Sequence, residues 1–173
     1  MTTYWAGIDP GLRGAIAVLR VEPGAQRPFL EEVKALPTYQ TLIGGKERRR
    51  YVLAEMLGMA RSVAMLYAPE RVAIEDVSGR GLQKGSSTFG YGVGALHMAC
   101  EAAKLPTITV PPSMWKAALR CPAQKAATVR IAQVRIDGVE GRFVGPKGGL
   151  LDGAAEAALI AYWAWARYGR REQ

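Results

Sequence analysis

Two short apolar runs separated by a turn open the chain. Residues 4–9 (YWAGID) have the apolar bulk of an interior strand, and residues 15–21 (AIAVLRV) form a similar run. The intervening PGLRG supplies Pro and Gly for a tight reversal, which favours antiparallel pairing of the two strands. Residues 29–38 (FLEEVKALPT) offer a third strand. We therefore expect residues 4–37 to form an antiparallel meander.

The periodicity changes to helical in the next segment. Residues 46–66 are predicted to form a helix, because one face carries Val52, Leu53, Met56, Met59, Ala60 and Val63. Residues 69–77 (PERVAIEDV) then form a short, strongly apolar strand, and residues 85–103 a helix with a Ser/Thr start. The small residues of that helix allow close approach of another backbone, either within the fold or across a dimer interface.

The C-terminal part alternates in the same way. Residues 105–119 predict a fifth strand and a Pro-Pro-Ser turn that caps a helix beginning near Met114. Helical stretches at 123–135 and 150–169 flank a glycine-rich loop at 141–149. The whole pattern predicts an α/β fold: a mixed five-stranded sheet of three antiparallel strands and then two parallel ones, flanked by helices.

Composition limits the protein class. A chain of 173 residues with 49% hydrophobic and 22% charged residues suits one soluble domain, and we see no repeat or linker in 1–173. No apolar stretch has membrane-spanning length, and the N-terminus lacks a secretory pattern. Cys100 and Cys121 make neither a disulfide framework nor a zinc spacing. We expect a cytoplasmic protein with no membrane and no small-molecule cofactor as partner.

The charge balance points to a polyanion. Lys and Arg number 23 against 15 Asp and Glu, a net charge of +8. Basic clusters lie in residues 44–51 (GGKERRRY), 78–85 (SGRGLQKG) and 167–173 (RYGRREQ). One cluster alone is typical of a solvated face, but a surplus of this size favours nucleic acid as the partner.

Four carboxylates stand at the ends of buried elements. Asp9 ends the first strand, and alternation puts Glu75 on one face of the fourth strand while Asp76 faces the other way. Asp152 and Glu156 lie four residues apart and share one face of the last helix. Simpler roles stay open for three of them: Asp9 bonding turn amides, Asp152 capping its helix, and Glu156 as a surface acid.

If the four acids meet, a counter-charge is required. Each pair of like charges about 4 Å apart costs roughly 4 kcal/mol at an effective dielectric of about 20. Hard divalent cations with oxygen ligands remove that penalty, and two of them can activate a water and stabilise the leaving oxygen of a phosphodiester. Zinc is disfavoured because the chain has one His and no paired cysteines.

These segments, in this order, resemble the RuvC-type Holliday-junction resolvases of the RNase H-like (retroviral-integrase) superfamily. The similarity runs through GIDPGLRGAIAVL, VAIEDV, VPPSMWKAAL and DGAAEAALIA. It implies an RNase H-like fold and a homodimeric endonuclease that cuts four-way DNA junctions symmetrically with two Mg²⁺ ions per site, or Mn²⁺ in their place. Carried over, the metal ligands are Asp9, Glu75, Asp152 and Glu156, and Lys116 lies near the scissile phosphate.

Two positions depart from the bacterial pattern. Ala155 stands where an Asp is usual, and the following Glu156 is similar to the phage-like branch, so the source is bacterial or a phage acting in the host cytoplasm. Ser78 stands where an aromatic wedge enters the junction, and the basic segment 78–92 could reach DNA instead. The expected DNA-binding residues are Arg13, Arg80, Lys84, Ser86, Ser87, Phe89, Tyr91, Lys116 and Lys147.

Other interpretations remain open. Phe89 and Tyr91 could be core residues of their helix, Lys116 could be solvated, and His97 fits a packed or surface histidine better than a general base. A nuclease for other branched DNA or for RNA, or a non-catalytic junction-binding module, would carry similar motifs. The first motif also resembles the phosphate loop of sugar kinases and actin-like ATPases, but 173 residues leave no room for their second domain.

Overall fold

The computed structural model describes residues 1–76, 86–122 and 124–171. Side chains of residues 86–89 and 171 fall outside this description. Within the described part, no helix combines the length and apolarity needed to cross a membrane.

Seven strands and six helical segments are present among these residues. The strands are β1 (Thr3–Ile8), β2 (Ala15–Val21), β3 (Phe29–Ala35), β4 (Thr38–Ile43), β5 (Lys46–Tyr51), β6 (Arg71–Glu75) and β7 (Thr107–Val110). The helices are α1 (Leu53–Tyr67), α2 (Ser86–Ala102), α3 (Pro112–Leu119), α4 (Lys125–Arg135), α5 (Asp152–Tyr168) and the short 3-10 helix η2 (Gly169–Arg171).

The central sheet has the predicted topology. Its order is β3-β2-β1-β6-β7, with β1–β2 and β2–β3 antiparallel and β1–β6 and β6–β7 parallel. The five-stranded mixed sheet and its strand directions are therefore confirmed. In this order the carboxyl ends of β1 and β6 are neighbours, which brings the residues that follow Ile8 and Ile74 to one edge.

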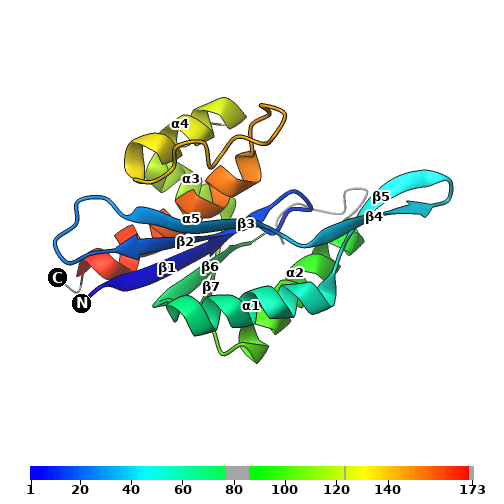
Figure 1. The fold of residues 1–173 in the computed structure, drawn as a ribbon, viewed down its shortest axis with the longest axis horizontal. Helices are drawn as coiled ribbons and strands as arrows, with labels where there is room; N and C mark the ends of the chain where they lie inside the picture. The colour runs from blue at the N-terminus through cyan, green and yellow to red at the C-terminus, as the bar shows by residue number, and fades with distance from the viewer. Residues whose placement is uncertain (77–85, 123, 172–173) are drawn as a thin grey trace.

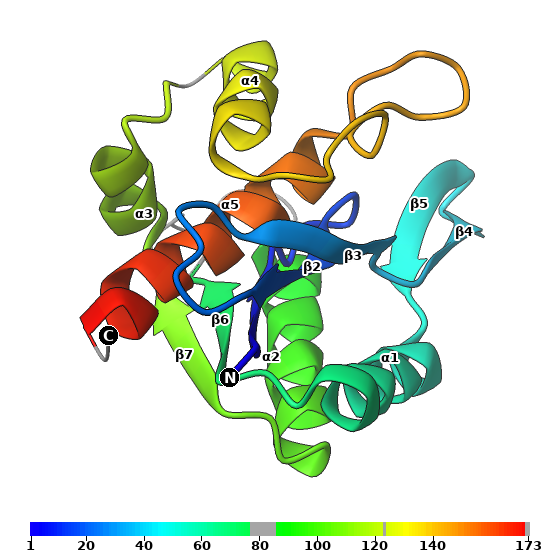
Figure 2. The same ribbon diagram turned by 60° about the vertical axis from the view of Figure 1, so that its left-hand side comes forward.

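Helices cover both faces of the sheet (Figures 1 and 2). On one face α5 packs directly on β1 and β2, with α3 and α4 against it. On the other face α1 and α2 enclose alternate residues of the same strands, such as Ala6, Ile8 and Ile74. Trp5 and Ala73 belong to the α5 side, so odd-numbered residues of β1 and β6 face α5.

The contact between β1 and α5 depends on a missing side chain. A Cβ built on Gly7 would overlap the carbonyl oxygen of Ala157 and the amide nitrogen of Ala161, both in the α5 backbone. Six of the seven alanines of α5 are buried, as expected for a slim helix packed closely on a sheet. This approach sets the depth at which the acidic first turns of α5 lie against the sheet.

The helix predicted for residues 46–66 is wrong over its first part. Residues 46–51 form β5, which pairs antiparallel with β4 as a separate two-stranded sheet, and α1 begins at Leu53. Gly44 and Gly45 have φ values of 58° and 73°, as a two-residue type I′ hairpin turn requires. The polar run Lys46–Arg50 has no apolar face for a helix to bury, so strand pairing determines its structure.

Candidate active site

Asp9 lies immediately after β1, where the chain turns towards β2. Its backbone N–H donates to the Ala15 carbonyl at 3.0 Å, and its Oδ1 accepts the Gly11 N–H at 3.0 Å. A Cβ at Gly14 would overlap the Asp9 carbonyl oxygen, so this tight turn needs glycine. One oxygen of Asp9 therefore does bind a backbone amide of the turn, as one of the two sequence-based interpretations expected.

The second oxygen of Asp9 faces the start of α5. A Cβ built on Gly153 would stand 3.0 Å from Asp9 Oδ2 and would overlap the carbonyl oxygen of Arg13. The absence of a side chain at residue 153 lets the first turn of α5 rest on the β1–β2 turn. Asp9 and the beginning of α5, which carries Asp152, are thus neighbours in space.

Glu75 is the last residue of β6 and is only 1% exposed. The paired residues Ile8 and Ile74 precede Asp9 and Glu75, so both acids follow the same rung of the parallel ladder. The fully buried Trp115 of α3 donates its indole Nε1–H to Glu75 Oε1 at 3.0 Å. This bond helps to hold a carboxylate in a position that would otherwise be costly to bury.

Asp152 and Glu156 begin α5, and each meets a lysine. Lys125 Nζ lies 2.6 Å from Asp152 Oδ2, and Lys116 Nζ lies 2.9 Å from Glu156 Oε1. The N-cap of α5 is Leu151, with no side-chain cap hydrogen bond, so the alternative role of Asp152 as a helix cap is wrong. The side chain of Glu156 is 23% exposed and paired, unlike an isolated surface acid.

The two lysines differ in exposure and in the number of contacts they make. Lys116 is 32% exposed and its Nζ also lies 5.0 Å from the centre of the Trp115 ring, so it is not a freely solvated residue. Lys125, at the start of α4, is 74% exposed, and its hydrogen bond to Asp152 raises its pKa above the ordinary value. The sequence identified Lys116 by its motif but offered no signal for Lys125, whose position depends on how α4 packs on α5.

The acids do not form a finished metal cluster. Among residues 1–76, 86–122 and 124–171, no three Asp, Glu, His or Cys side chains are arranged around a common metal position. The predicted convergence of all four acids therefore stays a prediction. The donor set nevertheless fits a hard divalent cation, because it consists of carboxylate oxygens and because two of the acids already hold ammonium cations.

Tyr51 attaches the end of β5 to the turn that carries Asp9. Its side chain is buried, and its hydroxyl donates to the Pro10 carbonyl at 2.6 Å. Burial and then the Asp9 charge raise the pKa of Tyr51 to about 12. A Cβ at Gly92 of α2 would overlap the Tyr51 ring, so this small residue of α2 serves packing within the fold.

The structure describes the expected DNA-binding residues to different extents. Arg13 and Lys147 are exposed, and Tyr91 is 60% exposed, so the core alternative is wrong for Tyr91. His97 is half-buried on α2. Arg80 and Lys84 lie outside the described residues. For Ser86, Ser87 and Phe89, only the backbone, in α2, is described.

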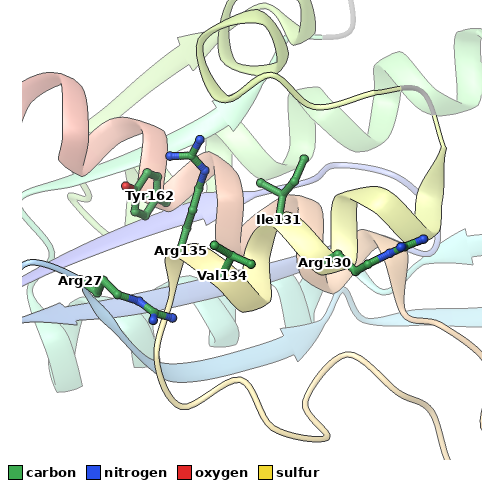
Figure 3. Close-up of a pocket in the computed structure, with 6 residues that line it drawn as sticks. All are labelled: Arg27, Arg130, Ile131, Val134, Arg135 and Tyr162. Carbon is green, nitrogen blue, oxygen red and sulfur yellow. The ribbon is translucent and has the colours of Figure 1, made fainter.

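A cleft of about 520 Å³ lies elsewhere, between α4, α5 and the β2–β3 connection (Figure 3). Its lining residues are Arg27, Arg130, Ile131, Val134, Arg135 and Tyr162. Arg27 donates to the carbonyls of Gln133 and Ile136 at 3.2 Å and pairs with Asp137 at 2.9 Å. Arg27 thus binds the C-terminal end of α4, and the cleft contains none of the four acids.

Replacing Trp115 by Phe tests the support of Glu75. Trp115→Phe keeps most of the buried ring but removes the donor to Glu75 Oε1. We expect about 1–3 kcal/mol less free energy of unfolding, from the lost bond to a buried acceptor. We also expect about 10–100-fold weaker divalent-metal binding, as is usual when a group orienting a ligand is lost. Chemical denaturation and calorimetric Mn²⁺ titration measure the two effects. The control is Trp163→Phe, in the C-terminal half of α5 and away from its two acids, which is expected to leave metal binding unchanged.

Searches of protein-family models and of curated proteins found no match. Similar solved structures include RuvC of T. thermophilus in complex with a Holliday-junction substrate, at 21% identity and a TM-score of 0.69, covering 98% of this chain and 96% of that one. Another Thermus thermophilus RuvC structure gives 22% identity, a TM-score of 0.62, and coverage of 98% and 97%. The yeast mitochondrial Holliday-junction resolvase Ydc2 gives 14% identity and a TM-score of 0.54, covering 96% of this chain and 81% of that one. The chain has the RuvC-like RNase H fold.

Proposed function

We propose that the chain is a divalent-metal-dependent endonuclease that resolves four-way DNA junctions by paired hydrolysis of phosphodiester bonds. The observation that carries this proposal is the placement of Asp9 and Glu75 at the adjoining ends of two paired strands, with the acidic start of α5 against Asp9. The net charge of +8 supports a nucleic-acid substrate. Two structural neighbours, one solved on a Holliday junction and one described as a junction resolvase, support the branched form of that substrate.

In this proposal the metal ligands are Asp9, Glu75, Asp152 and Glu156. When bound, two Mg²⁺ or Mn²⁺ ions supply an activated water and stabilise the leaving oxygen. Trp115 orients Glu75 through its indole N–H. The turn that holds Asp9 Oδ1 leaves Oδ2 directed towards α5, the side from which Asp152 approaches.

Lys116 and Lys125 have a second role in the proposal. Each neutralises a carboxylate of α5 while no other cation is present. If these carboxylates held divalent cations, the two ammonium groups would be available to bind the phosphate that is being cut. Charge at the site then stays balanced with and without substrate, which explains why two lysines accompany two acids of one helix.

A symmetric homodimer would present two such sites to one junction. Gly94 and Met98 lie exposed along one side of α2, and the small residues of this helix are the proposed contact between subunits, while Tyr91 stays a proposed DNA-binding residue. Arg13, Lys116 and Lys147 would bind DNA near each site, together with residues of segment 78–89. Glu156 in place of an earlier acid favours the phage-type branch, acting in the bacterial cytoplasm.

The test is nicking of labelled synthetic substrates by the purified chain. With Mg²⁺ or Mn²⁺ we expect paired nicks in opposite strands of a four-way junction near the branch point, and no nicking in EDTA. Flaps, linear duplex and an RNA–DNA hybrid are cut at least about tenfold more slowly (~1.4 kcal/mol) if the site selects the junction. Faster cutting of a flap or hybrid would reassign the substrate, and binding without cutting at any metal concentration would indicate a junction-binding module.

A further inference from the structure

The β4–β5 hairpin, residues 38–51, stands apart from the rest of the fold. It forms its own two-stranded sheet and projects beyond both helical layers, at the opposite end of the molecule from the two termini (Figure 1). Its six-residue strands, at about 3.4 Å per residue, reach roughly 20 Å. Neither the chemistry of the four acids nor the packing of the core requires such a projection.

One face of the hairpin carries three cations and no acid. The register pairs Tyr39 with Arg50, Thr41 with Arg48, and Ile43 with Lys46, and directly paired residues share a face. All three cations therefore lie on the same side, and no acid accompanies them on that side of residues 38–51. Glu47 is paired with Leu42 on the opposite face.

Except at its base, where Tyr51 is buried and Arg50 half-buried, the hairpin does not cover the core. Lys46 and Arg48 are exposed, and on the same face Tyr39 is 50% and Ile43 is 43% exposed. Leu42, on the other face, is 71% exposed. A hairpin that only sealed the fold would bury one side, whereas this one offers cations and apolar side chains to solvent on a single face. Charge complementarity makes a polyanion the matching occupant.

The base of the hairpin is fixed beside the candidate active site. Tyr51, its last residue, donates to Pro10, the residue after Asp9, and Val52 N–H donates to the Pro37 carbonyl at 2.9 Å. The hairpin therefore starts next to Asp9 and extends outwards. If the branch point of a DNA substrate lies at the acids, a duplex arm that leaves it along the hairpin is within reach of the basic face.

We propose that residues 38–51 form a DNA-binding arm that lies along a duplex arm of the branched substrate, with Lys46 and Arg48 on its phosphates. This proposal rests on the proposed function for the placement of the branch point. Contacts to phosphates position DNA without reading its sequence, so the arm contributes affinity and orientation and no base preference. Ile43 and the Gly44–Gly45 turn lie at its far end.

The first experiment measures binding of a four-way junction by fluorescence anisotropy in EDTA, where no cutting occurs. The variant Lys46→Gln/Arg48→Gln is expected to bind on the order of tenfold more weakly at about 0.1 M salt, and its plot of log affinity against log salt has a slope smaller by about two. Arg61→Gln/Lys104→Gln removes the same charge from exposed residues of α1 and the α2–β7 connection. That control is expected to bind as the wild type does.

The second experiment locates the arm on the DNA. Ile43→Cys in a Cys121→Ser background carries a thiol-linked photocrosslinker at the hairpin tip. We expect crosslinks in one duplex arm about six base pairs from the branch point, since roughly 20 Å spans that many steps of about 3.4 Å. Crosslinks confined to a second protein subunit would identify the hairpin as a subunit interface and overturn the proposal.

The two proposals fail in different ways. If the wild type binds and cuts the junction while the hairpin variant keeps its affinity and salt slope, the arm is refuted and the nuclease stands. A hairpin variant that sediments as a different oligomer from the wild type also refutes the arm. If the wild type neither binds nor cuts any branched DNA, both proposals fall together.

Discussion

Asp9→Asn is expected to lower Mg²⁺-dependent nicking of a four-way junction by at least about 10³-fold, because a metal-stabilised transition state is worth several kcal/mol and each 1.36 kcal/mol is tenfold in rate. The amide keeps the shape of the side chain, and its oxygen can still accept the Gly11 N–H. The lost property is the negative charge that faces α5. Junction affinity in EDTA is expected to stay at the wild-type level or to increase, since one repulsive charge is gone.

Single-turnover nicking measures the rate, and thermal unfolding with and without Mg²⁺ measures metal binding independently. A ligand that binds only the folded state raises the melting temperature, so Mg²⁺ stabilises the wild type more than it stabilises Asp9→Asn. Asp137→Asn is the matched control, an exposed acid paired with Arg27 away from the four acids. Wild-type nicking by Asp9→Asn would remove the proposed function.

The sheet could be predicted because its signals are local and agree with one another. Apolar runs bounded by Gly and Pro defined the strands, and the right-handed crossover rule placed residues 69–77 beside the first strand. Alternation along that strand put Ala73 and Glu75 on the face opposite Ile74, and in the structure Ala73 packs in the core beside α5 while Ile74 packs in the core beside α1 and α2. Each step needed only nearest-neighbour geometry.

The hairpin was missed because two patterns overlap at one boundary. The apolar helical face begins at Val52, and the charged residues before it were read as the continuation of the same helix. A charged run is compatible with a solvated helix or a solvated strand, so periodicity does not distinguish them. The Gly-Gly pair at 44–45 was the available signal, since two successive positive φ values favour a hairpin turn.

The polar contacts around the site depend on packing between segments that are distant in the sequence. Lys125 reaches Asp152 only because α4 lies against α5, and Tyr51 reaches Pro10 only because β5 ends beside the first turn. Sequence spacing fixes neither distance. The four acids could be identified from the sequence because each stands near the end of a predicted strand or the start of the last helix. Whether all four bind one metal site depends on their side-chain positions, and two of these side chains are held by lysines.

Gly7→Ala is expected to destabilise the fold by about 3 kcal/mol or more, at the upper end of overpacking effects. The added Cβ would overlap backbone atoms of Ala157 and Ala161. These atoms belong to a helix held between the sheet and α4, so they cannot swing aside as a flexible side chain can. Relief requires α5 to move away from β1, and that movement carries Asp152 and Glu156 with it.

Loss of nicking should therefore accompany the loss of stability. In thermal unfolding, about 3 kcal/mol corresponds to a decrease of roughly 10 °C in melting temperature for a chain of this size. Gly58→Ala is the control, because its exposed position on α1 meets no described atom within 4 Å, and alanine in an open helix position gains about 0.5–1 kcal/mol over glycine. If Gly7→Ala unfolds and nicks as the wild type does, α5 does not pack on β1 at the depth described, and the acids of α5 lie farther from Asp9 than the proposed site requires.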